Sequence, residues 1–182
     1  MKVKSSAKPL IGAAFVAAMG FTATAGANTV DLFTDPAATL QTVVVTKAEG
    51  AITKFSEFGP AGSIIGGYRD VIVTVNASGN PGTQADANAG QGGFSFNTGT
   101  AVNATASIQW DGQDNSELLN PTGLQVAGVG ANLVQQAGCP AAGCTKFITD
   151  VSFADQTFTY SIGVYTDATN YAILTSQAPG GI

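Results

Sequence analysis

The sequence predicts an all-β fold, a single jelly-roll-like β-sandwich that follows an N-terminal signal peptide. Two runs, residues 102–110 and 157–164, alternate between apolar and polar side chains. Because successive side chains of an extended chain point to opposite faces, each run forms a strand with one apolar face. Glycine- and asparagine-rich turns recur between such runs and helical periodicity is scarce, which is typical of a two-sheet sandwich. A closed barrel is the alternative.

Other segments predict further strands. Residues 70–76 are rich in β-branched side chains, and three of them share one face: Val71, Val73 and Val75. In residues 42–46, three consecutive valines leave neither face polar, which predicts a strand buried on both sides. Shorter strands are predicted at residues 94–96, 147–153 and 171–175.

Turn-forming residues separate these strands, at positions 59–62, 66–67, 80–82, 97–99 and 120–123. Residues 78–93 are of low complexity and predict an exposed loop between strands. Residues 124–136 are compatible with a loop or a short helix. Gly128 and Gly130 disfavour the helix, since each costs it roughly 1 kcal/mol relative to alanine.

Residues 1–27 predict a secretory signal peptide. A lysine-containing start precedes an apolar run at residues 10–21, and Ala25-Gly26-Ala27 matches a small-x-small cleavage site. The apolar run is too short for a comfortable membrane span. We therefore expect residues 28–182 to form one exported domain without a membrane span, located outside the cell or at its surface.

The expected mature domain is strongly acidic. Removing Lys2, Lys4 and Lys8 with the signal peptide leaves four basic residues against twelve acidic ones, a net charge of −8. Proteins bind nucleic acid and anionic lipid head groups through Lys and Arg, which neutralise the negative charge of the phosphates. Nucleic acid is therefore not an expected partner.

The two cysteines, Cys139 and Cys144, predict a disulfide. In an exported protein two nearby cysteines are more often bridged than reactive, and Pro140 and Gly143 favour the tight turn that this bridge requires. A zinc site would need further ligands, and the chain contains no histidine. Such a short bridge fixes a local turn more than it stabilises the domain.

The same lack of histidine predicts that the chain is not an enzyme. Ser-His-Asp and Cys-His arrangements are impossible without it. None of Lys47, Lys54 and Lys146 follows a serine at the Ser-x-x-Lys spacing. A carboxylate pair for glycoside hydrolysis stays open, because sequence alone does not place two distant acids face to face.

The segment at residues 110–117 carries the most suggestive polar side chains. Calcium takes six to eight oxygen ligands, and four side chains here supply oxygen: Asp111, Asp114, Asn115 and Glu117. Their spacing does not match an EF-hand loop, and the same residue types form ordinary turns after a strand. No cofactor other than calcium is expected.

Two residues beside these segments have alternative roles. Trp110 could stack on a sugar ring, as in carbohydrate-binding modules, but it shares a face with Val102 and Ile108, which favours core packing. Arg69 could form a binding rim with Asp70. Because neighbours in a strand face opposite sides, Arg69 could equally pair with a carboxylate elsewhere.

The order of short motifs resembles a family of secreted proteobacterial proteins that carry a PEP-CTERM sorting tail. These motifs lie at residues 30–36, 66–71, 110–112, 120–124 and 165–168. The resemblance implies export through the exosortase system and association with extracellular polymer, and it supplies no catalytic residues. The chain departs from the family at residues 178–182, which contain no Pro-Glu-Pro motif, apolar helix or basic tail. It is expected to be either a truncated member or freely secreted.

Three functions remain as hypotheses. The first is a non-catalytic cell-surface or extracellular-matrix protein with a structural or adhesive role, whose partners are extracellular polysaccharide or other matrix components. The second is a carbohydrate-binding module assisted by calcium, with Trp110 at its site. The third is a self-associating filament subunit that is completed by a strand from its neighbour.

Overall fold

The computed structural model describes residues 30–34, 40–46, 51–76, 84–125, 131, 133 and 151–181. Regular structure in these residues is antiparallel β-sheet apart from one three-residue 3-10 helix, η1, which confirms the all-β class. The elements are β1 (Gln41–Thr46), β2 (Ile52–Phe58), η1 (Ile65–Gly67), β3 (Arg69–Val75), β4 (Gln84–Gly90), β5 (Gly93–Thr98), β6 (Ala104–Gln109), β7 (Phe158–Tyr165) and β8 (Tyr171–Ala178).

All of these strands belong to one compact unit, residues 29–132 and 146–182. A second unit comprises residues 1–28 and 133–145, of which only residue 133 is described. The predicted signal peptide at residues 1–27 and the predicted disulfide between Cys139 and Cys144 therefore lie outside the described residues. No helix in the described part of the chain has the length and apolar character needed to cross a bilayer.

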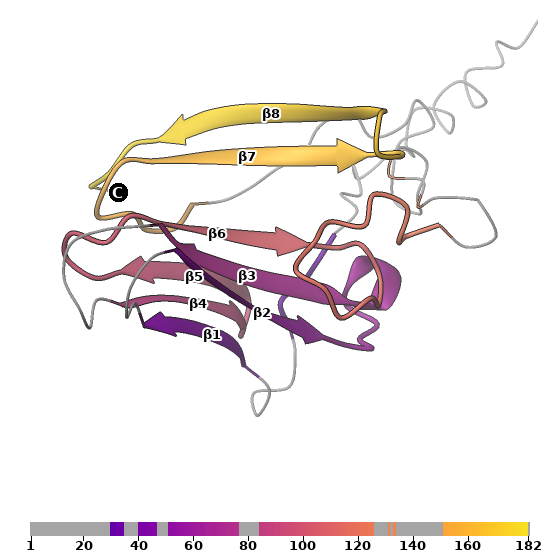
Figure 1. The fold of residues 1–182 in the computed structure, drawn as a ribbon, viewed down its shortest axis with the longest axis horizontal. Helices are drawn as coiled ribbons and strands as arrows, with labels where there is room; N and C mark the ends of the chain where they lie inside the picture. Colours follow the sequence, from indigo (N-terminus) through magenta and orange to yellow (C-terminus); the bar gives the residue numbers. More distant parts are fainter. Residues whose placement is uncertain are drawn as a thin grey trace, which may run out of the picture. The chain divides into compact units, whose positions relative to one another are not determined.

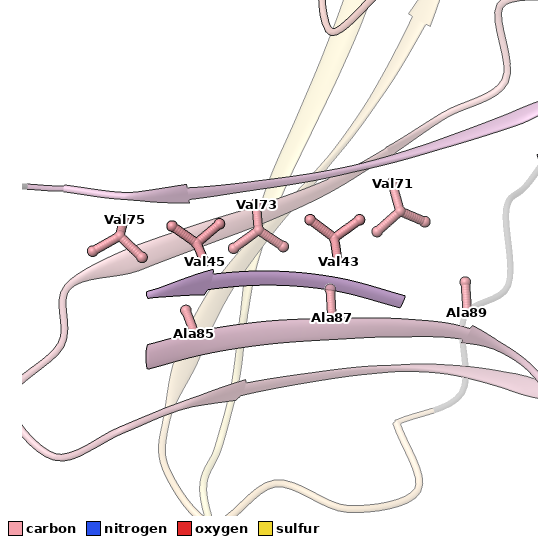
Figure 2. Packing of buried hydrophobic residues seen from close by; sticks show 8 residues of the cluster. All are labelled: Val43, Val45, Val71, Val73, Val75, Ala85, Ala87 and Ala89. Atoms are coloured by element: carbon pink, nitrogen blue, oxygen red, sulfur yellow. The ribbon is translucent and has the colours of Figure 1, made fainter. Parts of the chain in front are cut away.

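Six strands form two three-stranded sheets, β1-β4-β5 and β2-β3-β6 (Figure 1). Their inner faces share one core, contributed by every second residue of three strands: Val43, Val45, Val71, Val73, Val75, Ala85, Ala87 and Ala89. Figure 2 shows the valines of β1 and β3 interleaved beside the alanines of β4. Burial of each valine contributes about 1.5–3 kcal/mol, so this layer holds the two sheets together.

Strand β4 corrects the prediction of an exposed loop at residues 78–93. Residues 84–90 form the central strand of their sheet, and Ala85, Ala87 and Ala89 are fully buried. Asp86 and Asn88 alternate with these alanines, so the period of two was present in the sequence. It was missed because Ala, Asn and Asp are poor strand formers. The small alanines fit here because the facing valines fill the space between the sheets.

Strand β1 corrects the prediction of burial on both faces. Val43 and Val45 are buried at 4% and 0% exposure, whereas Val44 between them is 37% exposed. The outer face of β1 is therefore open to solvent, and its valine there reflects β-propensity, not burial. Strand β2 was not predicted at all. Its sequence, ITKFSEF, lacks regular alternation, and pairing along the whole of β3 holds it in place.

The remaining strand predictions are largely confirmed. Strands β3, β5, β6, β7 and β8 cover the predicted segments, and residues 120–123 form the predicted turn. Of the strand predicted at residues 147–153, the described part, residues 151–153, is not a strand. Strands β7 and β8 form a separate two-stranded sheet, in which the rings of Tyr165 and Tyr171 stack at 5.2 Å between centroids.

The alternation in β1 gives a direct stability test. We expect Val45→Ala to lower the free energy of unfolding by about 2 kcal/mol, because it removes two buried methyl groups from the shared core. We expect Val44→Ala, one residue away on the open face, to change it by less than about 1 kcal/mol. Urea unfolding followed by circular dichroism measures both. Equal losses would mean that β1 does not present one face to the core.

Candidate functional site

Arg69 lies at the end of the inner face of β3 and is fully buried. Its Nη1 lies 2.8 Å from Asp31 Oδ2 in an ion pair, and its Nε donates to Gln41 Oε1 at 2.9 Å. The guanidinium also lies over two rings, 5.0 Å from the centroid of Phe33 and 5.4 Å from that of Phe58. Removing one partner of a buried ion pair costs roughly 3–5 kcal/mol, so this pairing is structural.

Trp110 joins the same network. Its indole Nε1 donates to Asp31 Oδ2 at 3.0 Å, and its ring is half-buried. Stacking on a sugar uses the face of the ring and not Nε1, so this hydrogen bond neither supports nor excludes a sugar-stacking role for Trp110. Arg69 pairs with a carboxylate distant in sequence, as one of its two hypotheses predicted, and Asp70 lies on the opposite face of β3.

On that opposite face, three polar residues form a row across the sheet β2-β3-β6. Glu57 is in register with Asp70, and Asp70 is in register with Gln109. Side chains at such positions are direct neighbours on one face. Asp70 is fully buried, and single carboxylate oxygens of Glu57, Asp70 and Asp114 all lie within 4.8 Å of one another.

The segment at residues 110–125, which we call the acidic loop, places Asp114 against this row at the end of the sheet where β6 ends (Figure 1). Glu57 Oε2 accepts hydrogen bonds from the backbone N–H groups of Asp114 (2.9 Å) and Asn115 (2.7 Å). Asp111 Oδ2 accepts from the N–H of Asn120 at 2.7 Å. Both carboxylates therefore fix the backbone of the loop.

Two glycines, Gly112 and Gly123, permit the close approach of the two ends of this loop. A side chain at Gly123 would overlap the backbone carbonyl of Asp111, and Gly112 has a φ of +91°. Only glycine adopts such a φ without strain. These two positions bring the two ends of the loop together and keep Asp111 buried at 4% exposure.

Four buried side-chain oxygens at this place accept no hydrogen bond from any donor among the described residues. They are both carboxylate oxygens of Asp70, Oδ1 of Asp111 and Oε1 of Gln109. Each is a hydrogen-bond acceptor when the acids are ionised. A buried acceptor without a partner is costly, and a buried unpaired charge is more so. The cluster therefore needs a proton, a water molecule or a cation.

The ionisation of the cluster reflects the same cost. Burial raises the pKa of Asp70 from 3.8 to about 7; a hydrogen bond that protonated Asp70 donates to Asp111 and repulsion from Asp111, Glu57 and Asp114 add to the rise. Burial also raises the pKa of Asp111, while the N–H of Asn120 opposes that rise. Without a bound cation, burial and mutual repulsion disfavour the ionisation of both Asp70 and Asp111.

The calcium ligands predicted from the sequence are only partly brought together. Asp111 and Asp114 lie at the cluster, whereas Asn115 contributes its backbone N–H and Glu117 is exposed outside it. The sequence had not pointed to Glu57, Asp70 or Gln109 as metal ligands, and these residues come from three strands. One signal was available for Asp70, since it faces away from the valines in a strand that is otherwise β-branched. Glu57 required the unpredicted β2.

A shallow hollow of ≈ 380 Å³ lies elsewhere, beside the turn between β4 and β5, and no ionisable side chain lines it.

No protein-family model matches the chain, and neither the search of curated proteins nor that of solved structures returns a significant match.

The raised pKa of Asp70 predicts an unusual pH dependence in the presence of chelator. Between about pH 4 and pH 7, Asp70 holds a proton in the folded chain that it releases in the unfolded chain. The contribution of Asp70 to the free energy of unfolding is therefore fully present below pH 4 and is lost as pH rises towards 7. The slope is at most about 1.4 kcal/mol per pH unit for one proton. Urea unfolding in EDTA across this range measures it.

The control for this prediction is Asp70→Asn, which removes the titrating group while preserving its shape. We expect the variant to show a flatter dependence of the unfolding free energy on pH. A wild-type stability that is constant or rises over this range would contradict the prediction.

Proposed function

We propose that this chain is a non-catalytic, exported protein of the cell surface or extracellular matrix with a structural or adhesive role. The observation that supports it most directly is the hairpin β7–β8. Tyr171, Ile173 and Leu174 on β8 are 57%, 53% and 65% exposed. Exposed apolar side chains gathered on one element are typical of surfaces that contact other molecules.

The pairing of this hairpin points in the same direction. Within the described residues, β7 and β8 pair only with each other. A lone two-stranded sheet is marginally stable in water, and its outer edges expose unpaired backbone groups. Contact with another copy of the chain or with matrix polymer would satisfy both the edges and the apolar side chains.

The burial of Asp70 and Asp111 supports the non-catalytic part of the proposal. Asp70 and Asp111 are 0% and 4% exposed. The acid and base of a glycosidase must reach a substrate from a cleft, and these two do not face solvent. Their pKa shifts follow from burial and mutual repulsion, which structural clusters also produce.

Export itself is supported by the signal-peptide pattern of residues 1–27 and by the resemblance to PEP-CTERM proteins. In the producing organism, we expect the protein in the surface or matrix fraction and shortened by that segment. Immunolabelling of intact cells, combined with mass spectrometry of the fractions, tests this. Protein that is confined to the cytoplasm with residues 1–27 still attached would overturn the proposal.

The hairpin also favours a second candidate, a filament subunit that associates by strand addition. We expect the purified protein to form oligomers whose size grows with concentration, and Ile173→Lys on β8 to keep it monomeric. Leu118→Lys is the matched control, because Leu118 is 72% exposed and belongs to the acidic loop, not to β7 or β8. Light scattering measures both, and a monomer at every concentration rejects the filament.

A further inference from the structure

The carboxylate cluster has the composition of a site for a hard cation. Every side chain in it offers oxygen: carboxylates from Glu57, Asp70, Asp111 and Asp114, and an amide from Gln109. Calcium and magnesium prefer such ligands, whereas zinc and copper prefer the nitrogen or sulfur of His and Cys. The carboxylate oxygens of Glu57, Asp70 and Asp114 are close enough together, within 4.8 Å, to surround one ion.

The state of Asp70 is an independent sign of a ligand. Its side chain is fully buried, and no hydrogen-bond donor among the described residues reaches either carboxylate oxygen. Asp111 Oδ1 and Gln109 Oε1 are buried beside it in the same condition. Burying four acceptor oxygens beside several negative charges costs free energy. A bound cation offsets this cost, because it coordinates the oxygens and neutralises the charge.

We propose that Glu57, Asp70 and Asp114 bind a calcium ion that fastens the acidic loop to the sheet β2-β3-β6, beside the buried oxygens of Asp111 and Gln109. Glu57 and Asp70 come from the row across the strands and Asp114 comes from the loop, so the ion links the two. This set extends beyond the local segment at residues 110–117, and it contains neither the side chain of Asn115 nor that of Glu117.

Calcium fits this place better than magnesium. Magnesium requires near-ideal octahedral geometry and keeps several of its waters, which a fully buried Asp70 leaves little room for. Calcium accepts six to eight oxygens in flexible arrangements, and it tolerates ligands that come partly from rigid strands and partly from a loop. None of the ligands lies on β7 or β8, so the site does not depend on the function proposed above.

The experiment uses the purified protein stripped with EDTA. We expect CaCl₂ to raise Tm saturably, by roughly 5 °C at about 10 mM if the affinity is that of extracellular calcium modules. MgCl₂ at the same concentration should raise Tm less. Trp110, the only tryptophan, precedes Asp111, so terbium bound in place of calcium should luminesce on excitation of its indole.

Two variants and one control decide the assignment. Asp70→Asn should weaken calcium and terbium binding at least about tenfold, and Asp114→Asn, which alters the more accessible loop ligand, should do the same. Asp155→Asn removes the same charge from an exposed position outside the cluster and should bind as the wild type does.

Several results would overturn the proposal. They are a wild-type Tm that calcium leaves unchanged at about 10 mM, an equal response to magnesium, or undiminished terbium luminescence in Asp70→Asn. Should Asp70→Asn fail to fold, Asp114→Asn decides alone, and wild-type affinity in that variant rejects the site. Stabilisation by protons without any calcium response would assign the cluster to a shared proton instead.

Discussion

The structure depends on the burial of strand β3 on both faces. It pairs with β2 on one side and β6 on the other, and its inner face packs against the second sheet. Every residue of it but Thr74 is buried. Because side chains alternate, the neighbouring residues Arg69 and Asp70 are carried to opposite sides of the sheet and cannot neutralise each other through their side chains. Each charge must find its partner elsewhere.

The two sides meet this requirement differently. On the inner side, Asp31 comes from a segment distant in sequence, pairs with Arg69 and also accepts the indole N–H of Trp110, so the buried charge is compensated within the chain. On the outer side, the polar neighbours of Asp70 that the structure describes are further acids and the amide of Gln109. The same strand therefore contains one compensated buried charge and one that is uncompensated. That asymmetry makes the outer cluster a candidate ligand site, since an equally buried acid with a basic partner would need no explanation.

The sequence predicted strands wherever β-branched or aromatic residues alternate with polar ones, as in β3, β6 and β7. It failed at β4, where alanine marks the buried face, and at β2, whose alternation is irregular. The candidate site was half predictable for a related reason. Asp111 and Asp114 lie in one oxygen-rich segment that can be recognised locally. Glu57 and Gln109 join Asp70 only through strand register, which a single sequence does not reveal when one of the strands is unrecognised.

Two features of the described chain are left without internal compensation, and they differ in kind. The outer cluster has acceptor oxygens without donors, and the hairpin has apolar side chains and strand edges without cover. Buried oxygens without a donor can be satisfied by a small ligand, such as a water molecule or a cation. Open strand edges and exposed apolar side chains are instead covered by contact with another surface. A cation on one sheet and a neighbouring molecule on the hairpin would together complete the domain as a structural unit.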